Sequence, residues 1–266
     1  MRAADFAGLS GLDELAFHEE NLREYEAGSL SRIGPVGRVT LALNDLFQND
    51  QALAEVVLTD VAHPNTTLTF DNTKFHKERQ MSPFLQLNAK GVKRVTFRNV
   101  SVIDEAFFAF LTSMSGSKMA SFAAEDSEYF LSGLWMEFTY HLEHLEEFVL
   151  RNMEIPQFYG FPAIFIPEQL LRAFRRFSAV DCRVHTFPCE TSGDLPRLEH
   201  VDVSGNLLSD QKLREMMCDG SGRVFRALRS LSVSRNNLQS LGGGSRLLTR
   251  LELLEDVDMS GNTFHR

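Results

Sequence analysis

The stretch Leu198-Glu-His-Val-Asp-Val-Ser-Gly-Asn-Leu-Leu208 sets a spacing that the rest of the chain repeats. With the first leucine as position 1, apolar residues occupy positions 1, 4, 6 and 11, and Asn206 occupies position 9. Positions 4 and 6 alternate as in a short strand, and an amide at position 9 can both donate and accept hydrogen bonds at a tight turn. Two further clean copies of this pattern follow, at residues 228–238 and 254–264.

The same template matches the chain ten times, with starts 24 to 30 residues apart. This period is that of leucine-rich repeats, in which each unit supplies one strand and one return segment. Unrelated apolar alternation would not hold the period over ten units, which argues against an ordinary α/β domain. We therefore predict an α/β leucine-rich repeat solenoid, a horseshoe with parallel strands on its concave face and irregular return segments on its convex face. The repeats start at residues 12, 36, 65, 92, 119, 145, 174, 198, 228 and 254.

Position 9 divides this array. It is asparagine in the second repeat, as Asn44, and in the last three repeats, whereas repeats three to seven carry Thr73, Val100, Ser127, Met153 and Cys182. A stacked row of asparagines shares hydrogen bonds between neighbouring repeats, so its loss predicts a change in curvature. We predict one domain, 1–266, with an irregular part at 1–197 and a regular part at 198–266.

Composition and charge exclude several classes of function. The net charge of -9 argues against a nucleic-acid partner, because phosphate binding needs a basic stripe. The sequence has no apolar run long enough to cross a membrane and no basic-then-apolar leader sequence after Met1. It therefore predicts either a plain soluble protein or an internal segment of a longer one. His141 and His144 have a His-x-x-His spacing without a third ligand nearby. We predict no enzyme, no metal site and no cofactor.

Nine phenylalanines lie in the return segments of the middle repeats. Packed filler is the simpler interpretation for any one of them. As a group they also fit an internal apolar cavity, and both alternatives stay open. The nine are Phe107, Phe108, Phe110, Phe130, Phe138, Phe158, Phe161, Phe165 and Phe187.

Cysteines and glycosylation sequons both indicate an oxidising compartment. Cys182 takes position 9 of its repeat, where a small buried thiol can replace asparagine. Cys189 and Cys218 lie in consecutive return segments, so one solenoid turn could bring them together as a disulfide. Asn65-Thr-Thr67 and Asn99-Val-Ser101 are glycosylation sequons, with Asn65 and Asn99 as the acceptors.

Four motifs carry a resemblance to a known family. They are Asp5-Phe-Ala-Gly-Leu9, Phe97-Arg-Asn-Val100 followed by Asp104-Glu105, Ile155-Pro-x-Phe-Tyr159, and Val184-x-x-x-Pro-Cys189. With the order and spacing of the repeats, they make the chain resemble the middle of a Toll-like receptor ectodomain, in the subfamily of receptors 1, 2, 6 and 10. The resemblance implies the extracellular part of a longer single-pass receptor, whose membrane segment is absent from this chain. It also implies a convex-side pocket for an acylated microbial ligand, such as a lipopeptide, and dimerisation with a second receptor chain beside the pocket.

The resemblance assigns roles residue by residue. It places ligand binding on Phe161, Ile164, Phe165, Phe187 and Pro188, the dimer interface on Phe158, Tyr159, His185 and Thr186, and a disulfide on Cys189 and Cys218. His185-Thr186 depart from the Phe-Leu pair of the mammalian receptor, which makes the pocket rim less apolar. The alternative function is a protein-interaction solenoid with no small-molecule pocket.

Overall fold

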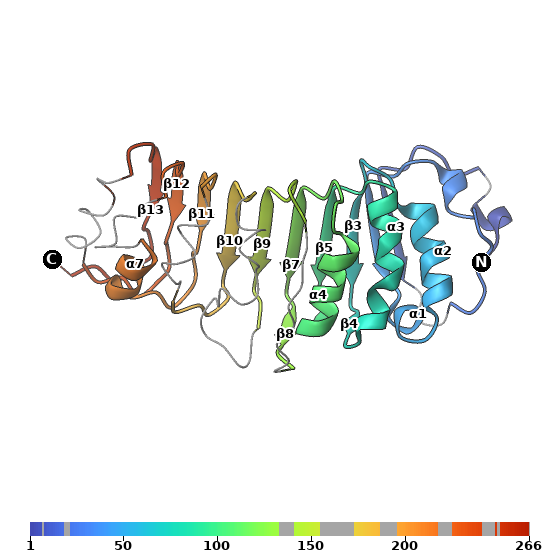
Figure 1. Cartoon of the computed structure of the whole chain (residues 1–266), viewed down its shortest axis with the longest axis horizontal. Helices are drawn as coiled ribbons and strands as arrows, with labels where there is room; N and C mark the ends of the chain where they lie inside the picture. The colour runs from blue at the N-terminus through green and yellow to red at the C-terminus, as the bar shows by residue number, and fades with distance from the viewer. Residues whose placement is uncertain are drawn as a thin grey trace. The chain divides into compact units, whose positions relative to one another are not determined.

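The computed structural model describes residues 1–6, 8–18, 22–132, 141–154, 173–186, 196–217, 225–240, 248 and 251–265. The chain divides into two compact units, Met1–His144 and Leu145–Arg266. In each unit, successive repeats place their strands side by side in a parallel sheet (Figure 1).

The first unit contains five strands of the main sheet. They are β1 (Glu14–His18), β2 (Arg38–Ala42), β3 (Thr67–Asp71), β5 (Arg94–Arg98) and β7 (Ser121–Glu125). Each pairs with the next in parallel, and the first residues of neighbouring strands lie opposite each other. All five strands occupy positions 3 to 7 of the template, so the predicted strands are confirmed.

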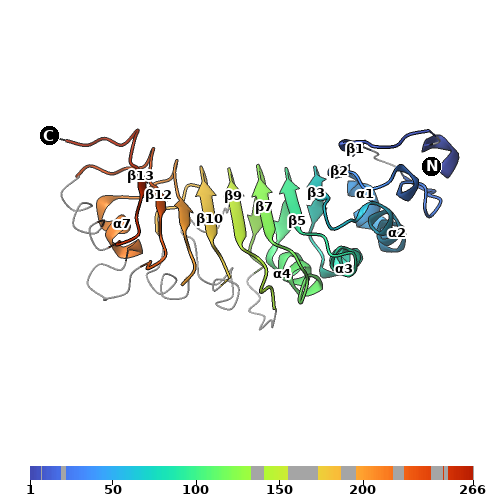
Figure 2. The ribbon, with the colours of Figure 1, turned by 90° about the horizontal axis from the view of Figure 1, so that it is seen from above.

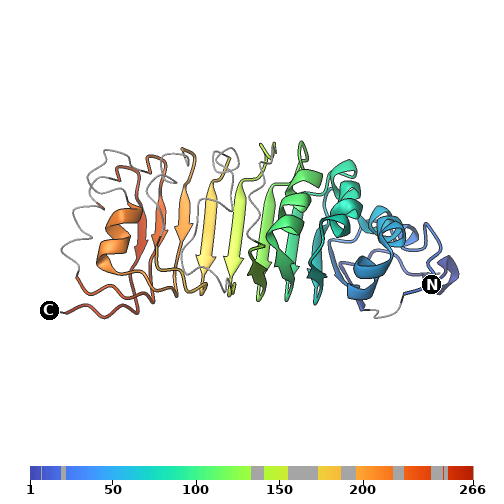
Figure 3. The same cartoon turned by 60° about the horizontal axis from the view of Figure 1, so that its bottom comes forward.

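Helices form the return segments of the first unit and cover one face of its sheet (Figures 2 and 3). They are α1 (Asn44–Asn49), α2 (Gln51–Val61), the 3-10 helix η3 (Glu78–Phe84), α3 (Leu85–Ala89) and α4 (Asp104–Ser113), and the 3-10 helices η1 (Ala3–Phe6) and η2 (Ser31–Ile33) precede them. Asp50 starts α2, since its carboxylate accepts a hydrogen bond of 2.9 Å from the Leu53 amide.

A second parallel sheet follows the main strands of repeats three to five. Its strands are β4 (Lys74–Phe75), β6 (Ser101–Ile103) and β8 (Glu128–Phe130), which occupy template positions 10 to 12. The leucine-rich repeat template does not predict this sheet. Its backbone hydrogen bonds join neighbouring repeats where asparagine is missing from position 9, so these repeats stay regular without the side-chain ladder.

The core of the first unit is a continuous cluster of phenylalanines. Phe97 lies at its centre, with ring centroids 5.2 Å from Phe110 and 5.3 Å from Phe122, and Phe84 lies 4.7 Å from Phe70. Phe107 and Phe110 belong to this buried cluster, which confirms the packed-filler interpretation for these two return-segment aromatics. Phe138, Phe158, Phe161, Phe165 and Phe187 lie outside the described residues.

The second unit contains the other five predicted strands. They are β9 (Glu147–Arg151), β10 (Arg176–Val180), β11 (His200–Asp202), β12 (Ser230–Ser232) and β13 (Asp256–Asp258), again paired in parallel and in register. Helix α7 (Asp210–Met216) is the described helix of this unit, and the Ser209 hydroxyl caps it by accepting a bond of 3.3 Å from the Lys212 amide. The starts of all ten repeats therefore agree with the predicted ones.

The predicted asparagine ladder is present in the last three repeats. Asn236 is 6% exposed; its Nδ2 donates to the carbonyl of Val203 in the previous repeat at 2.9 Å, and its Oδ1 accepts from the Leu208 amide at 3.0 Å. Asn206 and Asn262 make the same kinds of bonds to the repeats before them. Each amide thus joins two repeats, and the boundary at residue 197 drawn from this ladder stays a prediction.

Asn44 occupies the same template position but makes different contacts. It is the first residue of α1, and its Oδ1 accepts from the amide of Lys74 in the following repeat at 3.0 Å. The residue before it, Leu43, has a φ of -122° in the turn that leads directly into the helix. The residue type is the same as in the ladder, but the backbone around it is different.

Position 8 has a left-handed backbone in every repeat from the third to the tenth. Its residues, with positive φ, are Asn72, Asn99, Asp126, Asn152, Asp181, Gly205, Arg235 and Gly261. Glycine, asparagine and aspartate adopt this conformation more readily than other residues, which explains seven of the eight. The sharp turn at position 8 ends each strand and starts the return segment.

Candidate functional site

Most of the site predicted from the resemblance lies outside the described residues. This holds for the ligand-binding residues Phe161, Ile164, Phe165, Phe187 and Pro188, for Phe158 and Tyr159 of the dimer interface, and for Cys189 and Cys218 of the disulfide. His185 and Thr186 of the dimer interface are described. All these site assignments stay predictions.

The ladder fixes the point from which His185 and Thr186 leave the repeat. The backbone amides of Cys182 and Val184 both donate to Oδ1 of Asn206 at 3.0 Å. The carbonyl of Val184 in turn accepts from the Leu207 amide at 2.8 Å. Val184 is buried and held from two directions, so the residues that follow it start from a rigid position.

A surface of mixed polarity surrounds this exit point. We call it the His185 flank and define it as Glu154, Arg183, His185, Thr186 and Leu207. His185 is exposed and Thr186 is half-exposed, and the Leu207 side chain is 46% exposed although it is large and apolar. Arg183 forms an ion pair of 3.7 Å with Glu154. An exposed leucine framed by charged and polar groups is a common composition for a protein contact surface.

Cys182 is a buried free thiol, as predicted for an asparagine substitute. Its Sγ donates to the Val180 carbonyl at 3.2 Å, and it is also in hydrogen-bonding reach of the backbone of Asn152 and Met153 in the previous repeat. Burial raises the pKa of the Cys182 thiol to about 11. The thiol therefore stays protonated at neutral pH and is a poor nucleophile.

The strand face of the first unit is charged and solvated. Arg98 makes two hydrogen bonds to the Asp71 carboxylate, Nε–Oδ1 at 3.2 Å and Nη2–Oδ2 at 2.9 Å. These bonds raise the pKa of the Arg98 guanidinium above its ordinary value, so it stays charged. Arg38 pairs with Glu14 at 3.1 Å on the same face. Exposed pairs of this kind contribute about 0–1 kcal/mol each, so they mainly keep this face hydrated.

The second unit has alternating charges at position 2, just before each strand. Arg175 lies between Glu199, at 3.1 Å, and Glu146, at 3.7 Å. Arg229 pairs with Glu255 in the last two repeats. The pattern favours the native stacking order, because a shift by one repeat would place like charges together.

The two histidines with metal-like spacing are surface residues. His141 and His144 are both exposed, and the His141 amide donates to the Ser115 hydroxyl at 3.0 Å. Within the described ranges, histidine, cysteine, aspartate and glutamate form no group of three that could hold a metal ion.

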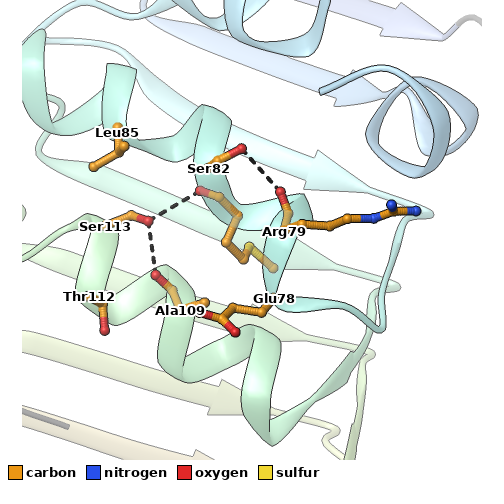
Figure 4. A pocket seen from close by; sticks show the side chains of 8 residues that line it. Glu78, Arg79, Ser82, Leu85, Ala109, Thr112 and Ser113 are labelled. Atoms are coloured by element: carbon orange, nitrogen blue, oxygen red, sulfur yellow. Dashed lines mark hydrogen bonds between the residues drawn. The ribbon is translucent and has the colours of Figure 1, made fainter. Parts of the chain in front are cut away.

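A groove of about 500 Å³ lies on the helix face of the first unit, between η3 and α4 (Figure 4). The Ser113 hydroxyl lies 3.2 Å from the Met81 carbonyl and 2.9 Å from the Ala109 carbonyl and can share its one hydrogen between them, so it joins the two walls. Leu85 is 53% exposed at one end of the groove. The sequence does not predict this groove, since its lining residues come from two repeats and share no periodicity.

Both sequon asparagines are exposed. Asn65 lies in the turn before β3, and Asn99 occupies the left-handed position after β5, with a φ of 53°. A second groove, of about 170 Å³, includes Asn99 in its lining.

One strand per repeat, the asparagine ladder and the turn at position 8 together define a leucine-rich repeat protein. Two solved structures share the fold: an internalin from Listeria monocytogenes, with a TM-score of 0.54, 12% identity and coverage of 91% of this chain and 58% of that one, and human 5T4, with a TM-score of 0.53, 18% identity and coverage of 77% and 71%. The predicted fold class is therefore confirmed.

The amino-acid sequence of the chain is similar to that of Toll-like receptor 2. The chain is 30% identical to the horse protein over 274 residues and 29% identical to the mouse protein over 277 residues, in both cases over 100% of its own length. It spans about a third of the length of these relatives, 33% of each. No family profile matches the chain. These matches confirm the predicted resemblance to part of a Toll-like receptor, and the relatives compared are Toll-like receptor 2.

Within the described residues, the structure has no helix long and apolar enough to cross a membrane.

Proposed function

We propose that this chain is part of the extracellular domain of a pattern-recognition receptor, binds an acylated microbial ligand and dimerises with a second receptor chain beside the bound ligand. The similarity to Toll-like receptor 2 over the whole chain is the observation that carries the proposal. In it, the ligand is held by Phe161, Ile164, Phe165, Phe187 and Pro188, and the membrane anchor belongs to segments outside this chain.

The chemistry of the ligand follows from the residues assigned to it. Five apolar side chains can bury a hydrocarbon chain, and each buried methylene contributes about 0.8 kcal/mol. Binding should therefore weaken steeply as the acyl chain is shortened. The net charge of -9 disfavours a polyanionic ligand such as a nucleic acid. The function proposed here needs no catalytic group and no cofactor.

The His185 flank supports the dimerisation part of the proposal. Its residues His185 and Thr186 come directly before the predicted ligand-binding residues Phe187 and Pro188. Asn206 anchors Val184 at the start of this segment, and Leu207 is exposed. A receptor partner would bury this leucine, and the ion pair of Arg183 with Glu154 would lie at the polar rim.

A protein-interaction solenoid without a pocket is the second candidate. One observation favours it: Phe107 and Phe110 are buried in a packed cluster, as every return-segment phenylalanine would be in a filled array. The two candidates differ in what a carboxylate at Phe161 does.

Titration of the purified chain with a synthetic lipopeptide tests the proposal, with Phe161→Asp as the main variant. An unpaired carboxylate in an apolar pocket costs several kcal/mol or shifts its pKa, so this variant should lose binding yet keep the circular dichroism spectrum of the wild type. Phe110→Asp is the matched control, because Phe110 is fully buried in the core and its substitution should unfold the first unit. A Phe161→Asp protein that binds normally, or that unfolds as the control does, would support the pocket-free solenoid.

A further inference from the structure

Asn99 stands at the rim of a polar groove on the first unit. The groove has a volume of about 170 Å³ and lies where the main strands end and the second sheet begins. Its lining residues are Asn72, Thr73, Lys74, Asn99, Val100, Ser101, Asp126 and Glu128. Three of them, Asn72, Asn99 and Asp126, occupy position 8 of successive repeats, with φ of 49°, 53° and 50°. The groove thus presents amide and carboxylate groups along consecutive repeats.

The Asn99 side chain is held in place without using all its donors. Its Nδ2 donates to Oδ1 of Asn72 at 3.3 Å. A primary amide nitrogen has two hydrogens, so Asn72 can retain one hydrogen bond while the other hydrogen is replaced by a substituent. The side chain is therefore oriented and still open to modification at Nδ2.

Two aromatic rings meet over the third residue of the same sequon. His76 follows β4 and Phe130 ends β8, and their ring centroids are 6.4 Å apart at an interplanar angle of 81°. Ser101 lies in β6, the strand between them, and its Oγ is 2.8 Å from Nε2 of His76. His76 is exposed and Phe130 half-exposed. A small residue at 101 lets rings from the repeats on either side approach each other beside Ser101, which also lines the groove.

We infer that Asn99 carries an N-linked glycan whose first sugar residues lie in this groove, against the His76–Phe130 pair. Groove polar groups can bond the sugar hydroxyls, and the C–H face of a pyranose ring carries the partial positive charge that the face of an aromatic ring attracts. The inference rests on the extracellular location in the proposed function, because only the secretory route supplies the donor. It does not depend on ligand binding.

The attachment is a substitution at one nitrogen. Nδ2 of Asn99 forms a bond to C1 of the first sugar, and the bond from C1 to a phosphate oxygen of a polyprenyl-diphosphate-linked oligosaccharide breaks. The amide loses one proton to the medium, and the polyprenyl diphosphate leaves with the electron pair of the broken bond.

Asn65 provides an internal comparison. It lies in the exposed turn at residues 64–65, and the next residue, Thr66, is buried with its Oγ1 donating to the Val36 carbonyl at 2.6 Å. Asn65 precedes the main strand β3 and Asn99 follows the main strand β5, so the two acceptors lie at opposite edges of the sheet. A glycan on Asn65 extends from an exposed turn into solvent.

Site-resolved mass spectrometry of the full chain, secreted from cultured animal cells and digested natively with a peptide amidase that removes N-glycans, tests this inference. We expect both asparagines to carry glycans and the Asn65 glycan to be released several-fold faster, since the groove shields the Asn99 linkage. His76→Ala should bring release at Asn99 close to the rate at Asn65, and His76→Phe should preserve the protection. His141→Ala, at an exposed histidine of the same unit, is the matched control and should change neither rate.

Different outcomes of this experiment contradict the seating of the glycan, its attachment and the proposed function. Equal release rates at the two sites in the wild type would overturn seating in the groove, and so would a His76→Ala variant that keeps full protection. A secreted chain without glycan at Asn99 would overturn the attachment itself. Loss of lipopeptide binding in a preparation that shows the expected glycan protection would count against the proposed function and leave this inference intact.

Discussion

Arg235 reaches across the repeat next to it and pairs with Asp181, with Nη1 3.3 Å from Oδ1. The residue between them at position 8 is Gly205, and a Cβ added to it would lie 1.7 Å from the Asp181 carboxylate oxygen. Gly205 also has a φ of 67°. The ion pair therefore requires glycine at position 205. The side chains of Asp181 and Arg235 occupy the space that a side chain at this position would fill.

Gly205→Ala should destabilise the chain by about 2–3 kcal/mol, from roughly 1 kcal/mol for a left-handed alanine plus the displacement of Asp181. Gly116→Ala is the matched control, because Gly116 has a φ of 71° but nothing within 4 Å of an added Cβ. It should cost only the backbone term. Urea unfolding of both variants measures the difference, and equal losses would show that Asp181 moves aside freely.

Asn236→Ala should cost roughly 2–3 kcal/mol. The substitution leaves buried partners of the amide unpaired in two repeats, among them the Val203 carbonyl and the Leu208 amide. Asn44→Ala removes one bond to the Lys74 amide near the surface and should cost less than about 1 kcal/mol. Chemical denaturation of the two variants checks the ranking. Similar losses would mean that Asn44 supports its repeat as much as the ladder asparagines support theirs.

The main strands could be predicted from the sequence, and the reason is physical. Residues such as Val201 and Val203 alternate into a core that every repeat shares, so period and register repeat with them. The left-handed turn could also have been found, because Asn72, Asn99 and Gly205 recur at position 8. The second sheet could not, since β4 and β6 are two and three residues long and show no alternation of their own.

Asn44 shows the limit of a template. Its side chain has the chemistry of the ladder, but a helix begins at this residue and turns the amide toward the following repeat. The ion pair of Arg235 with Asp181 is equally invisible in the sequence, since 54 residues separate its partners. For the site, composition indicated that aromatics gather in the middle repeats, but only the packing around Phe110 decides which of them fill the core.

Acidification should destabilise the first unit through His63. Nε2 of His63 is buried and has no hydrogen-bond partner in the described part of the chain. Burial, together with the charge of Lys90, lowers the pKa of His63 below its ordinary value of 6.5. The unfolded chain then binds this proton at a higher pH than the folded one. The stability is therefore complete well above pH 6.5 and is lost as pH falls from 6.5 through the lower folded value.

The residue His76 is exposed, but partial desolvation of its ring and the charge of Lys74 lower its pKa as well, so both histidines contribute to the slope. The double variant His63→Gln, His76→Gln should show a flatter dependence of melting temperature on pH between 7 and 5 than the wild type. His144→Gln, at an exposed position, serves as control. If the double variant and the wild type have the same slope, the loss of stability on acidification comes from other groups.

Cys189 and Cys218 should be joined in the secreted chain, and Cys182 should be a free thiol. Closing a loop of about 30 residues stabilises by roughly 3 kcal/mol on the loop-entropy argument. Cys182 is buried with a pKa of about 11, so it should resist alkylation until the chain unfolds. Peptide mapping with alkylation before and after denaturation follows all three. Labelling of Cys189 and Cys218 in the native protein would contradict the pairing.

Leu207→Asp should weaken dimerisation without unfolding the chain. Leu207 is 46% exposed on the His185 flank, and its amide bonds to Val184 through the backbone, so the substitution leaves the ladder unchanged. A carboxylate in a buried interface costs about 2–5 kcal/mol, which corresponds to a loss of at least tenfold in dimer affinity. Leu253→Asp is the matched control, since Leu253 is also 46% exposed but is not part of the flank and ends the return segment of the ninth repeat. His185→Phe should act in the opposite direction, because it adds an apolar side chain to the His185 flank. Sedimentation velocity in the presence of lipopeptide compares the three variants. Equal weakening by both aspartates would show that added charge, and not this flank, controls assembly. An unchanged dimer affinity in Leu207→Asp would contradict the placement of the partner on the His185 flank.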